Sequence, residues 1–103
     1  MLVYAIEGPF FFGAAETFER ALAITHSDPR ALIIRLRRVP FVDITGLQTL
    51  EEVIEDLQGR KVRVILCEAN ERVTRKLDKA GVLRMLGPDG FFSTFHAAVE
   101  SAR

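Results

Sequence analysis

The sequence predicts an α/β fold built around an open β-sheet. Short apolar runs rich in valine, isoleucine and leucine alternate along the chain with longer segments whose apolar residues recur at helical spacing. Residues typical of turns and helix caps separate these segments, as expected when strands and helices alternate. With 103 residues, 49% of them hydrophobic, the chain is large enough to form one domain, residues 1–103, with its own core.

The first part of the chain predicts a strand followed by a helix. Residues 2–7 have the composition of a strand, and Gly8-Pro9 ends it. The phenylalanines at 10–12 are expected in the core, or alternatively in an apolar patch that contacts another domain or a second copy. A helix is expected from Gly13 onward because four apolar residues share one face, namely Ala14, Phe18, Ala21 and Leu22. Ser27-Asp28-Pro29 ends this helix.

A second strand and an amphipathic helix follow. Residues 31–36 are almost uniformly apolar, which predicts a buried strand. An amphipathic helix is expected next, and its apolar face consists of Leu47, Leu50, Ile54 and Leu57. Gly59 is the expected C′ residue of this helix, and residues 62–66 predict a third strand. The outer face of the same helix is acidic, with Glu51, Glu52, Glu55 and Asp56.

The last third of the chain predicts two more helices around a short extended segment. Asn70 is expected to cap a helix that runs to Ala80 and is closed by Gly81. A turn at residues 87–90 precedes Phe91-Phe92, which reads as a short final strand or a buried anchor. Ser93 is expected to cap the last helix, whose apolar residues are Phe95, Ala98, Val99 and Ala102.

Composition narrows the classes of function. Fourteen basic residues balance fourteen acidic ones, so the overall charge favours neither a nucleic-acid partner nor direct membrane insertion. Cys67 is the only cysteine, which excludes an internal disulfide and fits a reducing compartment. No apolar run approaches the eighteen or so residues that span a bilayer, and no signal peptide is evident. These features lead us to expect a cytoplasmic chain, which could be a fragment of a longer protein.

The strand-to-helix junction Asp43-Ile44-Thr45-Gly46 carries the first candidate site. It places a carboxylate, a hydroxyl and a glycine where backbone N–H groups of a helix start favour an anion. On one interpretation Asp43 or Thr45 only caps the helix and Gly46 permits close packing. On the other, Thr45 is a phospho-acceptor or part of a recognition loop, because a phosphate at a helix N-terminus is stabilised by the helix dipole.

Three arginines form the second candidate site. Arg35 and Arg37 are two residues apart and therefore emerge on one face of the second strand. Arg63 alternates with the apolar residues of the third strand, so neighbouring strands would bring all three guanidinium groups to one sheet face. They could lie on a solvated edge or form salt bridges with helix carboxylates. Alternatively they form an anion- or partner-binding patch on a face that helices leave uncovered.

Patterns of enzyme and metal sites are missing from the sequence. It contains no phosphate-binding G-x-x-x-x-G-K, no C-x-x-C, no G-x-S-x-G and no H-E-x-x-H. His26 and His96 have no ligand-spaced partners and are expected at the surface or at helix ends. Cys67 is expected to be a small buried residue. We therefore expect no catalysis, no metal and no cofactor.

Three blocks of the chain resemble the STAS domain, the module shared by sulfate transporters and anti-sigma-factor antagonists. Residues 3–18, VYAIEGPFFFGAAETF, resemble the opening of the transporter branch, the SulP-type anion permeases. Residues 39–47, VPFVDITGL, resemble the signature loop. The segment from Asn70 through Leu77 and Gly81 resembles the third helix and its turn. The resemblance covers essentially the whole chain.

The resemblance implies the STAS fold, an open mixed β-sheet of about four to five strands packed with about four helices. It implies a non-catalytic regulatory and protein-interaction domain of a sulfate (SulP-type) anion transporter, cytoplasmic and tethered to the inner membrane in the full-length parent. The implied partner is the transmembrane transport domain of that parent or a cytosolic regulatory protein, with a homo-oligomer as a further option.

One departure from the family pattern distinguishes its branches. Stand-alone members carry two adjacent serines after the aspartate, and a partner kinase phosphorylates the serine just before the glycine. Here Ile44 and Thr45 occupy these positions, so the hydroxyl is kept as threonine and the intermediate serine is lost. This favours the transporter branch. The alternative is a stand-alone anti-sigma-factor antagonist that acts as a phosphorylation-controlled protein-binding switch.

Overall fold

A computed structural model describes residues 2–7 and 30–103 of the chain. The helix expected after Gly13, the phenylalanines at 10–12 and His26 lie outside the described residues. The described elements are β1 (Leu2–Glu7), β2 (Ala31–Arg38), α2 (Ile44–Gly59), β3 (Arg63–Cys67), α3 (Glu71–Lys79), α4 (Val82–Leu86), β4 (Phe91–Phe92) and α5 (Phe95–Ala102). The predicted strands and helices in these ranges are confirmed, and α4 is an additional short helix.

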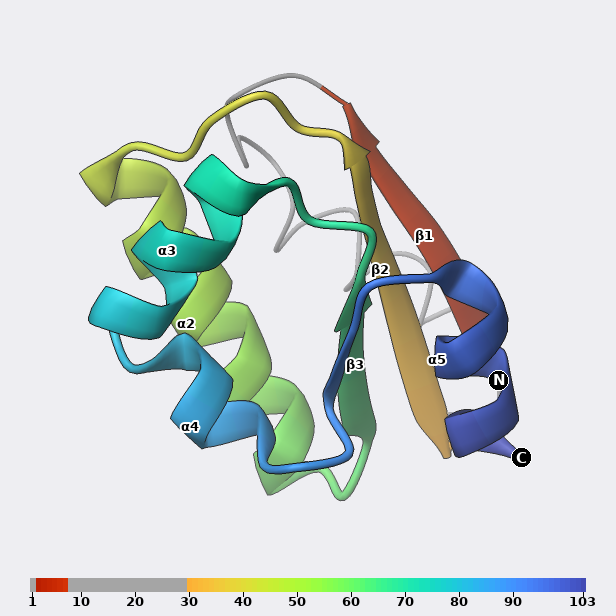
Figure 1. Ribbon diagram of the computed structural model, residues 1–103. Coiled ribbons are helices and arrows are strands. Elements are labelled where there is room, and N and C mark those ends of the chain that lie inside the picture. Colours follow the sequence, from red (N-terminus) through yellow and green to blue (C-terminus); the bar gives the residue numbers. More distant parts are fainter. Residues whose placement is uncertain (1, 8–29) are drawn as a thin grey trace.

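The described strands form one open sheet in the order β1-β2-β3-β4 (Figure 1). We expected mixed pairing, but every described neighbour pair is parallel. Leu32 pairs with Leu2 on one side and with Val64 on the other, so β2 lies inside the sheet. This position explains the nearly continuous apolar sequence of β2, because a parallel strand covered on both faces has no solvated side.

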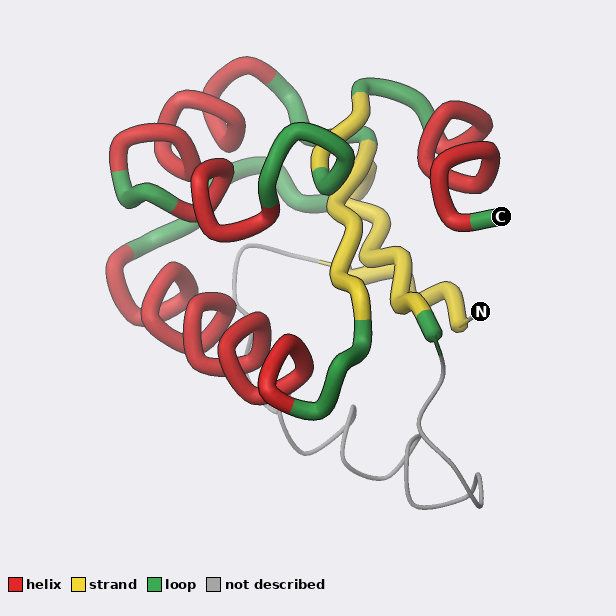
Figure 2. Tube along the Cα trace, turned by 90° about the horizontal axis from the view of Figure 1, so that it is seen from below, coloured by secondary structure: helices red, strands yellow, loops and turns green. Residues whose placement is uncertain are grey.

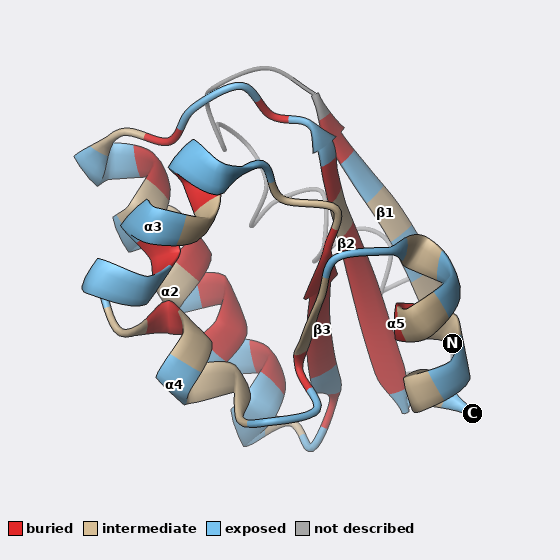
Figure 3. Ribbon diagram, in the orientation of Figure 1, coloured by how far each residue is buried: buried red, intermediate tan, exposed pale blue. Residues whose placement is uncertain are grey.

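Helices α2, α3 and α4 cover one face of this sheet, and α5 lies on the opposite face (Figures 1 and 2). The predicted apolar face of α2 points to the sheet, since Leu50, Ile54 and Leu57 are buried and Leu47 is partly buried. Figure 3 shows buried residues concentrated along β2, β3 and the inner side of these helices. The core on this face includes Leu32, Ile34, Leu36, Val64, Leu66, Val73, Leu77 and Val82.

The second face of the sheet is packed against α5. Ile33 and Ile65 of the central strands, with Cys67, form a smaller buried cluster with Ala98. Phe95 and three other partly buried residues complete it, namely Phe92, Val99 and Ala102. The expectation that helices leave the arginine-bearing face uncovered is therefore wrong, because α5 packs on Ile33, Ile65 and Cys67, which lie on the same face as the arginines.

Two helix ends differ from the sequence-based expectation. Gly59 is the last residue of α2 and not its C′ residue; Lys61 has φ 62° and takes the left-handed conformation. The N–H groups of Lys61 and Val62 bind the carbonyls of Gln58 and Leu57 at 3.0 and 2.9 Å, which is a Schellman motif. Thr94, not Ser93, caps α5, and its hydroxyl accepts the N–H of Ala97 at 3.1 Å.

Candidate functional site

The segment that joins β2 to α2 alternates between buried and exposed residues. Val39 and Val42 are buried, whereas Phe41 is 41% and Ile44 73% exposed. The buried pair fixes the segment against the core, which leaves two large apolar side chains facing solvent. We call residues 39–46 the junction loop; it runs from the carboxyl end of β2 to the start of α2 (Figure 1).

The start of α3 holds the junction loop in place. The Asn70 side-chain oxygen accepts the N–H of Val73 at 2.8 Å, which confirms Asn70 as the cap of α3. Its amide nitrogen donates to the carbonyls of Val39 and Pro40 at 3.3 and 3.1 Å. One side chain therefore satisfies a helix end and two loop carbonyls. The junction loop is positioned by packing and by these hydrogen bonds.

Asp43 and Thr45 have separate roles at the start of α2. The Asp43 carboxylate accepts the N–H of Gly46 at 2.7 Å and caps the helix. Thr45 lies in the first turn and is exposed, while Gly46 is buried. The hydroxyl of Thr45 is thus not the cap, and its carbonyl accepts the Thr49 hydroxyl at 3.0 Å. The geometry leaves Thr45 accessible to a partner or a modifying enzyme.

The three predicted arginines share a sheet face but not a site. Arg63 pairs with Ala31, four residues before Arg35, which places the two residues roughly 13 Å apart along the sheet. The Arg63 guanidinium donates to the carbonyls of Ser101 and Asp89, both at 2.6 Å, and to the Ser101 hydroxyl at 2.5 Å. Arg63 therefore joins the end of α5 to the turn before β4 and stands apart from Arg35 and Arg37.

Arg35 is held in a fixed orientation at the carboxyl end of the sheet. Its Nε and Nη2 bind the two carboxylate oxygens of Glu68 at 2.5 and 3.1 Å. The ring of Phe95 lies 4.1 Å from the guanidinium carbon. The hydrogen bond from Arg35 lowers the pKa of Glu68, and the charge of Arg37 contributes in the same direction. The salt bridge thus involves a carboxylate at a strand end and not the helix carboxylates considered from the sequence.

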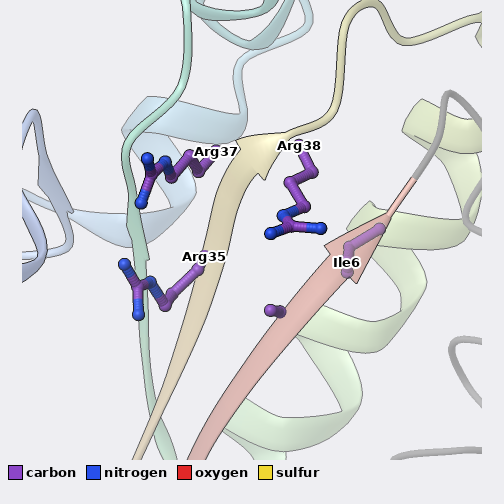
Figure 4. A pocket seen from close by; sticks show the side chains of 5 residues that line it. Ile6, Arg35, Arg37 and Arg38 are labelled. Carbon is purple, nitrogen blue, oxygen red and sulfur yellow. The ribbon is translucent and has the colours of Figure 1, made fainter.

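A pocket of about 250 Å³ opens beside this pair. It is lined by Ala5 and Ile6 of β1 and by Arg35, Arg37 and Arg38 of β2. Figure 4 shows Arg35 and Arg37 projecting on one side of β2 while Arg38 lies between β2 and β1. The structure therefore adds Arg38 to the predicted arginine set and separates Arg63 from it.

The remaining candidate residues, Cys67 and His96, have positions that do not suggest a reactive or metal-binding role. Cys67 is buried, and burial raises its thiol pKa to about 11, which disfavours the nucleophilic thiolate. His96 is exposed near the start of α5, as expected. Within residues 2–7 and 30–103, no cluster of histidine, cysteine and carboxylate side chains is suited to hold a metal ion. No helix in the same ranges has the length and hydrophobicity needed to cross a bilayer.

Sequence reasoning missed the contributions of Glu68 and Arg38. Glu68 has φ 65°, an uncommon conformation for a residue other than glycine, and its carboxylate holds Arg35. The sequence did contain a signal for the Arg35–Glu68 contact. Glu68 directly follows the apolar run of β3, and the carboxyl ends of parallel strands lie at one edge of the sheet. Arg38 simply extends the arginine series of β2 into the strand end.

Comparisons of this chain with protein families, known sequences and solved structures all identify the same family. Residues 1–102 match the family described as STAS domain. The chain is similar to the "Putative sulfate transporter YvdB" of Bacillus subtilis, with 26% identity over 92 residues. This match covers 87% of the chain but only 17% of that relative, so the chain spans less than a fifth of the relative's length.

Two solved structures are similar over almost the whole chain. The STAS domain of a SulP transporter from Vibrio cholerae is 48% identical, with a TM-score of 0.90, and the match covers 98% of this chain and 79% of that one. A sulfate transporter family protein from Wolinella succinogenes is 33% identical, with a TM-score of 0.85, and the coverage is 98% and 83%.

Proposed function

Because this chain belongs to the STAS domain family, we propose that it is the non-catalytic regulatory domain of a SulP-type anion transporter. The similarity to the Vibrio cholerae SulP STAS domain supports the transporter branch over the stand-alone branch. On this proposal the domain lies on the cytoplasmic side of the inner membrane. It acts by binding the transmembrane transport domain of the parent protein, and a cytosolic regulatory protein is the second possible partner.

The observation that carries this proposal is the exposed apolar pair of the junction loop. Phe41 and Ile44 are large, solvent-facing side chains on a segment that Asn70 and the buried valines hold in place. Ordered apolar side chains that stay exposed mark interaction surfaces, because burying them against a partner is favourable and costs little additional ordering. The exposed Thr45 lies between Ile44 and the buried Gly46, so a charge added there would enter the same contact.

Anion uptake by cells that express the full-length parent protein tests this function. Ile44→Asp is expected to change uptake severalfold with unchanged abundance in the membrane, because it places a charge in the contact. Gln48→Asp, at an exposed position one turn further along α2, is the matched control and should leave uptake unchanged. Identical uptake by wild type and Ile44→Asp would refute a regulatory contact through this loop.

Thr45 separates a recognition role from a structural one. Because Asp43 caps the helix, Thr45→Ala should change the free energy of unfolding by no more than about 0.5 kcal/mol. Thr45→Glu should also be tolerated, since negative charge in the first turn of a helix is favourable. If the loop is a contact surface, Thr45→Glu alters uptake while Thr45→Ala does not. Equal effects of both substitutions would assign Thr45 to packing.

The alternative function is a phosphorylation-controlled switch of the anti-sigma-factor-antagonist type. Thr45 is exposed and occupies the position of the family's phospho-acceptor, which supports this alternative function. Phosphate incorporation at Thr45 by a partner kinase, detected by mass spectrometry and lost in Thr45→Ala, would support it. An open reading frame that continues through many apolar segments of about twenty residues would instead support the transporter.

A further inference from the structure

The solvent side of α3 carries a stripe of positive charge. Val73 and Leu77 are buried and turn one side of this helix to the core. Four exposed basic residues follow the i, i+3, i+4 and i+7 spacing that aligns side chains along a helix, namely Arg72, Arg75, Lys76 and Lys79. We call these four residues the basic stripe. It extends along roughly 10 Å of the helix, and Figure 1 shows α3 on the side of the molecule away from α5.

The described part of the chain does not neutralise the basic stripe. No ion pair or hydrogen bond joins any of its four side chains to residues 2–7 or 30–103. Glu71 and Asp78 belong to the same helix but lie roughly 100° around its axis from the centre of the stripe. In α4, Arg84 is the only charged residue and is exposed, so it adds charge of the same sign. The basic stripe is therefore available to a negatively charged partner.

Helix stability accounts for only part of the basic stripe. Lys76 and Lys79 lie in the last turn of α3, where positive charge is favourable because of the helix dipole. Arg72 lies in the first turn, where positive charge opposes the dipole, and Arg75 lies in the middle of the helix, beyond its reach. These two arginines stabilise neither the helix end nor a contact among the described residues, so their partner is expected outside the domain.

A lipid surface fits the basic stripe better than a folded protein does. Protein interfaces usually bury an apolar or aromatic anchor at their centre. Among the described residues the large exposed apolar side chains are those of Val3, Phe41 and Ile44, and none belongs to α3 or α4. A row of long cations without an anchor suits a diffuse layer of anionic headgroups, to which each lysine or arginine adds about fivefold in affinity. The choice of lipid rests on the proposed function, which tethers the domain beside such a layer.

We propose that the basic stripe binds the anionic phospholipid headgroups of the cytoplasmic leaflet and thereby orients the domain. The contact is peripheral: the cationic side chains reach headgroup phosphates, and no apolar side chain enters the bilayer. Helix α2 reinforces the orientation, because Glu52, Glu55 and Asp56 are exposed on it and are repelled by the same surface. The chain has no net charge, so the attraction depends on this separation of charge between the two helices.

Cosedimentation of residues 1–103 with phospholipid vesicles tests the proposal. Vesicles of phosphatidylglycerol and phosphatidylcholine in equal parts should bind the chain, whereas pure phosphatidylcholine vesicles should not. Raised salt should release the chain, because counterions screen exposed charges. Equal binding to both kinds of vesicle, or binding to neither at millimolar lipid and physiological ionic strength, overturns the proposal. Polyglutamate is the second probe: if it binds the chain as tightly as the anionic vesicles do, the partner is an acidic polypeptide and the lipid proposal fails.

Paired substitutions locate the contact. Arg72→Gln combined with Arg75→Gln should weaken binding to the anionic vesicles roughly twenty-five-fold, about fivefold for each charge. Arg30→Gln combined with Arg103→Gln is the matched control, since it removes the same charge from exposed positions and should bind nearly like wild type. The start of β2 and the end of α5, where these two residues lie, are away from α3 (Figure 1). Equal weakening by both pairs would show that overall charge alone determines binding and would overturn the proposal. Both variants should melt like wild type.

Paramagnetic broadening tests the orientation. Bicelles of the same lipid composition with nitroxide-labelled headgroups should broaden the amide NMR signals of α3 most and those of α5 least. Strongest broadening in α2 or α5 would contradict the proposed orientation. These measurements need no transport domain, so their failure would leave the regulatory contact through the junction loop intact. Conversely, identical uptake by wild type and Ile44→Asp would leave vesicle binding unaffected.

Discussion

The two faces of the sheet bind their helices by different means. On the α2–α4 face, long apolar side chains such as Leu50, Ile54 and Leu77 are buried against β2 and β3. On the α5 face the described buried cluster is small, and polar contacts from Arg35 to Phe95 and from Arg63 to Ser101 supplement it. The first face provides apolar burial, which is cooperative and independent of pH. The second relies more on charged groups, whose contribution depends on pH and salt.

The largest effect is expected from a charge on the α2 side. Leu50→Asp places a carboxylate in the apolar core and should destabilise the domain by several kcal/mol, enough to lose the cooperative melting transition. Gln48→Asp on the exposed side of the same helix should change stability by less than about 0.5 kcal/mol. Thermal melting followed by circular dichroism measures both. A Leu50→Asp variant that melts like wild type would refute the packing of α2 described above.

A smaller, local effect is expected on the α5 side. Arg63→Ala removes the hydrogen bonds to Ser101 and Asp89 and should cost about 1–2 kcal/mol. Native-state hydrogen exchange should show faster exchange in α5 while the amides of β2 stay protected, because local opening does not require the other face to unfold. Arg72→Ala is the control for removing an exposed arginine. Uniformly faster exchange throughout the domain would mean that the two faces form one cooperative unit.

The smallest effect is the pH dependence of the Arg35–Glu68 pair. Folding lowers the pKa of Glu68, so the pair stabilises the protein above the ordinary glutamate pKa of about 4.3. That stability is lost as pH falls through the lower folded-state pKa. Wild type should have a higher free energy of unfolding than Glu68→Gln at pH 7, and the difference should vanish at strongly acidic pH. A difference that persists unchanged in acid would exclude an ionic origin.

Local sequence signals predicted most of the fold. The apolar runs of β2 and β3, the helical spacing of α2 and the Asn70 cap are encoded within a few neighbouring residues, and the structure confirms them. Lys61 was missed because a glycine two residues earlier was the better local candidate for a left-handed residue. The helix α4 was missed because its five residues are too short for a periodic pattern.

The candidate site was less predictable because its contacts join distant parts of the chain. Strand alternation placed Arg35, Arg37 and Arg63 on one face, but register decides which of them are neighbours. Nothing near Arg63 in the sequence points to its partners Ser101 and Asp89. The Arg35–Glu68 pair likewise depends on the pairing of β2 with β3, which a single sequence does not specify.

The order of strands in the sheet has a consequence for how the chain is made. Among the described strands, β2, β3 and β4 each pair with the strand that precedes them in the chain, so this sheet can extend at a single edge while the protein leaves the ribosome. The face that α2, α3 and α4 cover can close before α5 is synthesised. The elements that contribute the large core therefore leave the ribosome before α5, the last helix to be synthesised.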